Sequence, residues 1–197
     1  MKIVLMRHGK PNFDLPSHRR KKVAPADLNQ IKQRYDQSLI NPNHPASHEA
    51  IITARRCNAV LCSDLPRSLT SAKALGLSAI ADFNTLFREP DLPHGDRRWP
   101  HLSIYNWLIY YRFLWFFGYR HNGESIKLFK RRTRKASELL IQTARDHGSV
   151  ILVGHGWINH YIARNLLAAG WQGPKSPGRQ YWQFGVYTMP QTHQQPP

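Results

Sequence analysis

The chain has 197 residues and a mass of 22.9 kDa, a length that suits one domain or one domain carrying an insertion. Hydrophobic residues make up 41% of the chain and charged residues only 20%, so disorder along the whole chain is excluded. The formal net charge of +16 attracts anions, which leaves nucleic acid, acidic lipid and phosphorylated metabolites as candidate ligands.

The cysteine content and the N-terminal residues bear on where the protein works. Cys57 and Cys62 are the two cysteines of the sequence, so neither a disulfide framework nor a four-cysteine zinc site is expected. The apolar run at residues 3–6 is shorter than the core of a signal peptide. We therefore expect a reducing, cytoplasmic location.

Four short apolar runs predict strands, in chain order at residues 3–6, 59–62, 150–153 and 181–187. The first three lack alternation of apolar and polar residues, which is typical of strands buried on both faces of a parallel sheet. Helical patterns predict a weak helix at 26–39 and stronger helices at 47–57, 66–76, 124–147 and 158–166. Strands that alternate with helices predict a three-layer α/β/α sandwich with a mostly parallel central sheet.

The expected organisation is one domain over residues 1–197, with an aromatic-rich insertion at about 96–122 and a disordered tail at about 191–197. Residues 104–117 hold eight of the 22 aromatic residues, so this segment demands burial. It is shorter than the roughly 20 residues that span a bilayer. Three interpretations stay open: a substrate-selecting wall over a cleft mouth, a subunit interface, or contact with a membrane surface.

Cationic residues follow each of the first three apolar runs. Arg7 and His8 follow the first run, Arg67 comes shortly after the second, and His155 follows the third. The carboxyl ends of parallel strands share one edge of a sheet, and ligands bind in the crevice outside that edge. Helices that start there also point free N–H groups at the same place. The sequence therefore predicts an anion pocket.

These motifs give the chain a resemblance to the histidine phosphatase superfamily, which contains cofactor-dependent phosphoglycerate mutases and related phosphatases. The matching segments are LMRHGKP at 5–11, CSDLPRS at 62–68, GES at 123–125 and VGHG at 153–156. The resemblance spans most of the chain and implies a phosphoglycerate mutase-like fold. It implies a metal-independent phosphomonoester hydrolase that needs no cofactor and acts on a phosphorylated small molecule.

The resemblance also implies a covalent phosphohistidine mechanism, in which His8 attacks phosphorus while Arg7, Arg67 and His155 hold the phosphoryl oxygens. Physical chemistry supports these roles, because a planar guanidinium matches phosphate oxygens and a loose transition state mainly needs charge stabilisation. The two arginines should lower the pKa of His8 and keep it neutral for attack. The alternatives are a phosphoglycerate mutase-like phosphotransferase and a non-catalytic polyanion-binding module on the same fold.

The general acid is expected to be Glu89, which follows a further predicted strand and lies where many family members place an acidic residue. Asp91 and Glu124 are the rival acids. An ion pair of Glu89 with Arg88 or Arg97 is the alternative, purely structural interpretation.

Asn12 is a candidate extra phosphate contact, because relatives of the mutase type have an asparagine several residues beyond the histidine. His155 and His160 lie five residues apart without the glutamate of a helical zinc site, so no metal is expected. Basic clusters occur at 19–22 and 127–135. The second is interpreted as the solvated face of a helix, and nucleic acid is not expected as a partner. No transmembrane segment is expected, and a homodimer is left open.

Overall fold

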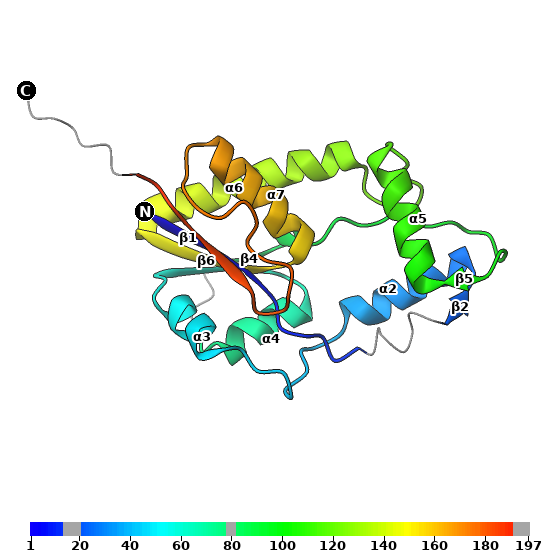
Figure 1. Cartoon of the computed structure of the whole chain (residues 1–197), viewed down its shortest axis with the longest axis horizontal. Coiled ribbons are helices and arrows are strands. Elements are labelled where there is room, and N and C mark those ends of the chain that lie inside the picture. Colours follow the sequence, from blue (N-terminus) through cyan, green and yellow to red (C-terminus); the bar gives the residue numbers. More distant parts are fainter. Residues whose placement is uncertain (14–20, 78–81, 191–197) are drawn as a thin grey trace, which may run out of the picture.

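The computed structural model describes residues 1–13, 21–77 and 82–190. It has an α/β fold in which one central sheet carries helices on both faces (Figure 1). Three of the four strand pairings in this sheet are parallel, and one is antiparallel. The predicted α/β class with a mostly parallel sheet is confirmed. The expected tail at 191–197 and part of the basic cluster at 19–22 lie outside the described residues.

Five strands form the central sheet in the spatial order β4-β3-β6-β1-β7. Their bounds are β1 Lys2–Arg7, β3 Ala59–Ser63, β4 Asp82–Asn84, β6 Ser149–Gly154 and β7 Phe184–Thr188. A separate antiparallel pair joins β2 Lys22–Val23 to β5 Leu102–Ser103. The strands predicted at 3–6, 59–62 and 150–153 are therefore present, each extended by a residue at one or both ends.

Six α-helices are present among the described residues: α2 Leu28–Asp36, α3 His48–Arg55, α4 Pro66–Ala74, α5 Ile104–Phe116, α6 Ile126–His147 and α7 Gly156–Ala168. The 3₁₀ turns η1 Pro25–Asp27 and η2 Thr85–Phe87 precede α2 and follow β4. Ser47 caps α3 and Ser125 caps α6, each through its side-chain oxygen. The weak helix predicted at 26–39 is shorter at both ends, because residues 25–27 form the 3₁₀ turn and the helix ends at Asp36.

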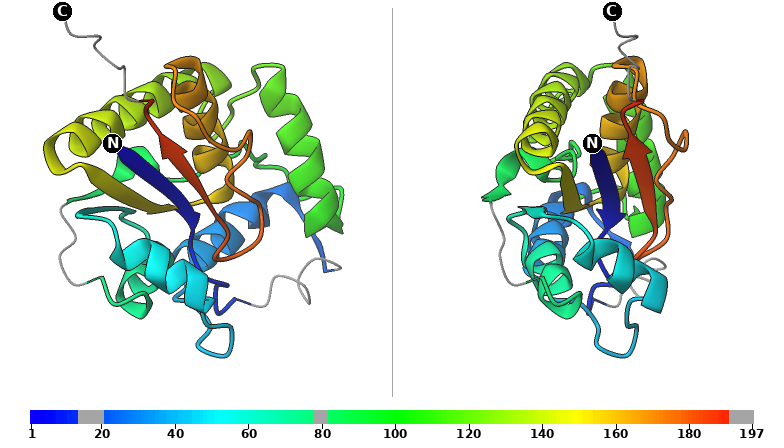
Figure 2. Two further views of the ribbon diagram at one scale, coloured as in Figure 1. Left: turned by 60° about the vertical axis from the view of Figure 1, so that its left-hand side comes forward. Right: turned by 90° about the vertical axis from the view of Figure 1, so that its left-hand side faces the viewer.

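The sheet is buried on both faces, as its unbroken apolar runs predict. Successive residues of a strand point to opposite faces. Ile3 and Leu5 of β1 pack with residues of α6 and α7, whereas Val4 and Met6 pack with residues of α3 and α4 (Figure 2). All four side chains are fully buried. This two-sided burial holds the carboxyl ends of β1 and β6 in a fixed register.

The last strand differs from its prediction at 181–187. β7 begins only at Phe184 and runs antiparallel to β1. Residues 180–183 form a turn instead, in which the N–H of Gln183 donates to the carbonyl oxygen of Gln180 and Trp182 has a φ of 66°. A left-handed backbone conformation at Trp182 is incompatible with a strand, so the aromatic run is divided between the turn and the strand.

The aromatic segment forms α5, which lies beside α2 (Figure 1). Its inward face is buried and consists of Ile104, Trp107, Tyr111 and Trp115. Its outward face is exposed and includes Tyr105, Ile109, Tyr110, Phe113 and Phe116. The earlier expectation of burial is therefore met on one face of the helix, while a subunit interface or a membrane contact on the other face stays a prediction.

Candidate active site

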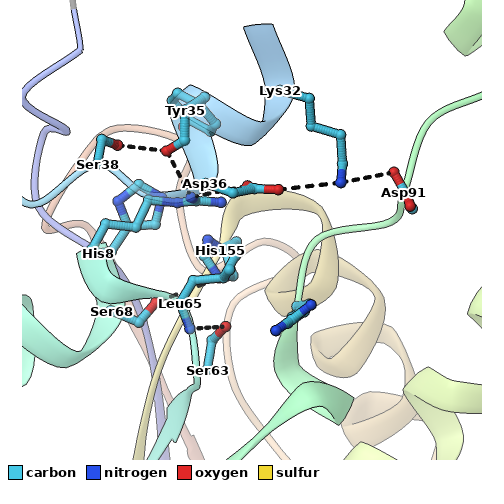
Figure 3. A network of polar contacts seen from close by, with 12 residues as sticks. His8, Lys32, Tyr35, Asp36, Ser38, Ser63, Leu65, Ser68, Asp91 and His155 are labelled. Atoms are coloured by element: carbon cyan, nitrogen blue, oxygen red, sulfur yellow. Dashed lines mark hydrogen bonds and ion pairs between the residues drawn. The ribbon is translucent and has the colours of Figure 1, made fainter. Parts of the chain in front are cut away.

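The carboxyl ends of β1 and β6 bring two histidines together. His8 follows β1, and its backbone N–H donates a hydrogen bond of 2.9 Å to the carbonyl oxygen of Gly154, the last residue of β6. His155 comes next along the chain, and the centroids of the two imidazole rings are 4.9 Å apart. Both side chains are buried. The parallel pairing of β1 and β6 thus places the two histidines side by side (Figure 3).

The contacts of the His8 ring define its tautomer and its charge. Its Nδ1 lies 2.7 Å from the carbonyl oxygen of Gly9. Because a carbonyl oxygen only accepts, Nδ1 carries the proton and Nε2 keeps a lone pair. Burial, together with the charges of Arg67 and Arg7, holds the pKa of His8 well below its usual value of 6.5. The ring is therefore neutral near pH 7, the form that a nucleophile needs.

The loop after His8 is fastened to α4. The N–H of Gly9 donates to the Oγ of Ser71 at 2.8 Å, and the Ser71 hydroxyl donates to the carbonyl oxygen of Arg67 at 2.6 Å. Both serine contacts are buried. Ser71 therefore couples the position of His8 to the helix that carries Arg67.

Arg67 lies in the first turn of α4 and is 1% exposed. Its Nη1 donates to the carbonyl oxygen of Tyr35 at 3.2 Å and to Oδ1 of Asp36 at 3.1 Å. Its guanidinium carbon lies 4.4 Å from the centroid of the Tyr35 ring. Asp36 also pairs with Lys32, which in turn pairs with Asp91, both at 3.2 Å (Figure 3). The C-terminal end of α2 therefore holds the orientation of Arg67.

Arg7, the last residue of β1, is held from the opposite side. Its Nη1 donates to the carbonyl oxygen of Arg179, and its guanidinium carbon lies 4.4 Å from the centroid of the Tyr181 ring. Among the described residues, Arg7 Nε, Arg67 Nε and His155 Nδ1 are buried nitrogens without a hydrogen-bond partner. An unpaired buried polar group costs about 1–3 kcal/mol, so these three nitrogens suit a ligand with several acceptor oxygens.

His155 precedes α7 and contributes a second neutral imidazole. Its Nε2 lies 3.4 Å from the Oγ of Ser68, in the first turn of α4. Burial, followed by the neighbouring His8 and Arg67, holds the pKa of His155 well below 6.5. The negative charge of a phosphoryl group would oppose this shift and favour a protonated His155.

Glu89 joins the site through the N-terminus of α7. Its Oε1 accepts a hydrogen bond of 2.7 Å from the backbone N–H of Trp157, the second residue of that helix. Burial raises the pKa of the Glu89 carboxyl, while the Trp157 N–H and the charge of Arg112 oppose the shift. Glu89 follows η2 rather than a strand, because Asn84 turns the chain by accepting from the N–H of Leu86.

The rival acids are engaged elsewhere. Both oxygens of Glu124 accept from Arg132, at 2.9 and 2.7 Å, and Asp91 pairs with Lys32 at the rim. Within the part of the chain that the structure describes, Glu89 forms no ion pair with Arg88 or Arg97, and both oxygens of Asp64 accept from Arg88. Arg132 also departs from the solvated face predicted for 127–135, since it donates to the carbonyl oxygens of residues 86, 88 and 89.

The structure does not bring Asn12 to the other site residues. Pro11 forms an isolated bridge with Ile40, and the N–H of Asn12 donates to the carbonyl oxygen of Leu39 at 2.7 Å. Asn12 is exposed and is not among the residues that line the cavity. The candidate phosphate contact at Asn12 stays a prediction.

A cavity of about 480 Å³ contains the predicted residues. Arg7, His8, Arg67, Glu89 and His155 all line it. The lining also includes apolar and aromatic side chains from α2, α5 and the loop after Glu89, namely Leu28, Ile31, Leu92, Pro93, Ile104, Trp107, Leu108 and Tyr111. The same elements contribute the polar residues Lys32, Tyr35, Asp36, His94 and Arg112. The inward side of α5 is thus part of the cavity wall, in line with the first of the three interpretations of the aromatic segment.

Sequence reasoning missed the residues that support the site from a distance in the chain. Tyr35 and Asp36 hold Arg67 from α2, a helix whose apolar pattern is weak. Arg112 of α5 lines the cavity. Its guanidinium carbon lies 4.3 Å from the centroid of the Trp157 ring. A single cation inside an otherwise aromatic helix was the signal that could have identified Arg112.

Within residues 1–13, 21–77 and 82–190, no group of three or more His, Cys, Asp or Glu side chains could hold a metal ion. In the same part of the chain, no helix has both the length and the apolar character needed to cross a membrane.

Comparison with solved structures supports the fold. The protein of the open reading frame Rv3214 from Mycobacterium tuberculosis is 15% identical, with a TM-score of 0.62 over 97% of this chain and 92% of its own. Mycobacterial glucosyl-3-phosphoglycerate phosphatase Rv2419c is 18% identical, with a TM-score of 0.59 over 94% and 88%. Bacillus stearothermophilus YhfR is 16% identical, with a TM-score of 0.60 over 94% and 89%.

A search of curated proteins gives no match. The sequence model of the histidine phosphatase superfamily (branch 1) matches residues 45–189, a range that contains Arg67, Glu89 and His155. Arg7 and His8 precede that range and join it through the pairing of β1 with β6. The match covers more than half of the chain, and the chain belongs to the histidine phosphatase superfamily.

Proposed function

We propose that the chain is a metal-independent phosphomonoester hydrolase that forms a phosphohistidine intermediate on His8. Membership of the superfamily supports a phosphatase-type function. The observation that carries the finer proposal is the neutral, oriented imidazole of His8 between Arg7 and Arg67 in one cavity. Glu89 lines the same cavity and supplies a carboxyl group with a raised pKa.

In the first step, Nε2 of His8 attacks phosphorus, an N–P bond forms and the bond from phosphorus to the ester oxygen breaks. Glu89 donates its proton to that oxygen, so the leaving group departs as a neutral alcohol. Burial favours the protonated carboxyl that this step requires. The Nδ1–H of His8 keeps donating its hydrogen bond to the carbonyl oxygen of Gly9 in this step.

In the second step, water attacks the phosphoryl group of phosphohistidine and the N–P bond breaks. The Glu89 carboxylate takes the proton of the attacking water, which returns the acid to its starting state. Inorganic phosphate leaves and His8 becomes neutral again. One carboxyl group thus serves as acid in the first step and as base in the second.

Charge stabilisation comes from the cations around His8. Phosphoryl transfer spreads negative charge over the equatorial oxygens, and catalysis consists mostly of positioning and electrostatics. A unit cation and anion about 4 Å apart interact by roughly 4 kcal/mol at an effective dielectric constant of ~20, before desolvation. Arg7, Arg67 and a protonated His155 would share this role, with the N-terminus of α7 beside them.

The experiment is turnover of p-nitrophenyl phosphate in EDTA by the wild type, His8→Ala and His101→Ala. His101 is an exposed histidine outside the cavity lining and serves as the matched control. We expect turnover by the wild type and the control and none by His8→Ala. Rapid quenching of the wild type should trap phosphate on His8 as an acid-labile, alkali-stable adduct.

Three outcomes would overturn the proposal. Equal turnover by His8→Ala and the wild type would remove His8 as the nucleophile. Transfer of the trapped phosphate to an added alcohol or phosphoglycerate, in place of water, would favour the mutase-type alternative. Absence of turnover together with polyanion binding that weakens steeply with salt would favour the binding module.

A further inference from the structure

The cavity has two chemically different halves, and the second half bears on the substrate. Charged and hydrogen-bonding groups surround His8, whereas α2, α5 and the loop after Glu89 supply a surface in which apolar side chains outnumber the polar ones, Lys32, Tyr35, Asp36, His94 and Arg112. Leu28 and Ile31 come from α2, and Ile104, Trp107 and Leu108 come from α5. A phosphoryl group on His8 would leave the alcohol part of the ester facing this apolar half.

The apolar half is a fixed wall, because it belongs to a small core of its own. Val23, Leu28, Ile104, Trp107 and Tyr111 form one buried cluster. The ring planes of Trp107 and Tyr111 are stacked, with centroids 5.5 Å apart. Aromatic packing of this kind stabilises the relative positions of α2 and α5.

The polar ends of the aromatic side chains in this wall are already paired. Nε1 of Trp107 donates to the carbonyl oxygen of Val23 at 2.9 Å. The Tyr111 hydroxyl is hydrogen-bonded to the backbone of Gly95. At the rim, Lys32 is shared between Asp36 and Asp91 (Figure 3).

These contacts distinguish between classes of phosphomonoester. Sugar hydroxyls placed against Leu28, Ile31, Ile104 and Leu108 would lose water without gaining hydrogen bonds, which is unfavourable. Alkyl or aryl groups in the same place gain free energy from burial of their apolar surface. Resting on the proposed hydrolase function, we propose that the preferred substrates are monoesters of apolar alcohols, seated with the alkyl or aryl group between α2 and α5.

The first experiment measures kcat/KM for straight-chain alkyl phosphates from methyl to hexyl. The leaving alcohols in this series differ little in acidity, so chain length changes the apolar contact and leaves the chemical step nearly constant. We expect kcat/KM to rise by up to roughly fourfold for each added methylene. Propyl phosphate should exceed glycerol phosphate, which has a similar length but carries hydroxyls.

Two substitutions on adjacent residues of α5 provide the structural control. Leu108 lines the cavity and is 39% exposed, whereas Ile109 is 52% exposed and lies outside the cavity lining. Leu108→Asn should flatten the chain-length dependence, and Ile109→Asn should leave it as in the wild type. Ile31→Asn, on the α2 side, provides a second wall variant if Leu108→Asn alters folding.

Binding of alkylphosphonates, measured by calorimetry on the wild type, separates this proposal from the proposed function. Phosphonates cannot be hydrolysed, so their affinity tests the wall without any turnover. Affinity that rises from methyl- to hexylphosphonate with no turnover of any ester would support the wall and contradict the hydrolase. Affinity and kcat/KM that do not change with chain length, or a preference for glycerol phosphate, would overturn the apolar substrate class.

Discussion

The Glu89 carboxylate and the Trp157 backbone N–H form a hydrogen bond of 2.7 Å that ties the loop after η2 to the first turn of α7. Trp157 lies two residues beyond His155, so the same turn positions both the carboxyl group and the second imidazole. Burial raises the pKa of Glu89 while this N–H opposes the shift. Glu89 is therefore held at a defined place, and burial favours its protonated form more than water does.

We predict that Glu89→Gln slows the hydrolysis of alkyl phosphates much more than the hydrolysis of p-nitrophenyl phosphate. An alkoxide leaves poorly without a proton, whereas p-nitrophenolate is a good leaving group and hardly needs one. General acid catalysis contributes roughly 10²- to 10⁴-fold, so we expect a loss in this range for butyl phosphate and less than about tenfold for the aryl ester. Steady-state kcat for both esters measures the difference.

Asp91→Asn provides the matched control, because Asp91 is a rival carboxylate that pairs with Lys32 at the rim. We expect this variant to reduce kcat for butyl phosphate and for p-nitrophenyl phosphate by the same small factor. Equal slowing of both esters by Glu89→Gln would remove Glu89 as the general acid. Selective slowing of butyl phosphate by Asp91→Asn would assign the role to Asp91 instead.

The sequence allowed the sheet and the two histidines to be predicted because their signals are local. Unbroken apolar runs such as residues 150–153 occur where a strand is covered on both faces, and His8 and His155 each follow such a run. Parallel pairing then brings together residues that are far apart in the chain. No comparable local signal marks the support of Arg67 by Asp36, which depends on where α2 packs.

Asn12 and Trp182 each carry a local sequence signal that does not predict their position in the structure. The spacing of Asn12 from His8 suggests a phosphate contact, but Asn12 is exposed and lies outside the cavity lining. Trp182 lies in an aromatic run typical of a strand, and its positive φ ends that pattern. In both cases the local sequence pattern does not determine where the residue lies in the folded chain.

We predict that Arg67→Lys lowers kcat/KM for p-nitrophenyl phosphate by about 100-fold. Lysine keeps the charge, but its single amine cannot do three things at once: bind Asp36, stack on Tyr35 and direct a second nitrogen at the phosphoryl oxygens. Arg88→Lys is the matched control, because Arg88 is partly exposed and pairs with Asp64 outside the cavity. A similar loss in both variants, or a near-normal rate for Arg67→Lys, would contradict the role of the planar guanidinium.

The buried histidines predict a pH dependence of stability with a defined sign. The pKa values of His8 and His155 lie below 6.5 in the folded state, so below that pH the unfolded state binds more protons. Their contribution to stability is complete above pH 6.5 and is lost as the pH falls towards their folded pKa values. Each histidine lowers the free energy of unfolding by up to about 1.4 kcal/mol per pH unit in this window.

Urea unfolding at pH 7.5, 6.5 and 5.5 measures this effect for the wild type, His155→Asn and His101→Asn. The difference between wild type and His155→Asn should shrink as the pH falls, while His101→Asn should follow the wild type. Glu89 contributes to the pH dependence of stability with the opposite sign, because its raised pKa favours protonation of the folded state. Both proteins contain Glu89, so its contribution cancels in the difference between the wild type and His155→Asn. Parallel curves for the wild type and His155→Asn would contradict a buried neutral imidazole.

We predict that Gly9→Ala destabilises the protein and lowers its activity. A Cβ at residue 9 would lie 2.3 Å from Cζ2 of Trp182, which is 8% exposed and whose Nε1 donates to the carbonyl oxygen of His44. The indole ring or the loop after β1 must therefore shift, at a cost of about 1–3 kcal/mol for overpacking. The same shift moves the Gly9 carbonyl oxygen, which orients His8, and reduces kcat.

Gly156→Ala is the matched substitution next to the other histidine. A Cβ at residue 156 would lie 3.8 Å or more from its nearest neighbours, the Arg7 guanidinium atoms, and this is an ordinary van der Waals contact. Gly156 is also the first residue of α7, where alanine costs no backbone strain. We therefore expect the urea midpoint of Gly156→Ala to match or exceed that of the wild type. If Gly9→Ala unfolds at the same urea concentration as Gly156→Ala, the ring of Trp182 does not constrain the loop that carries His8.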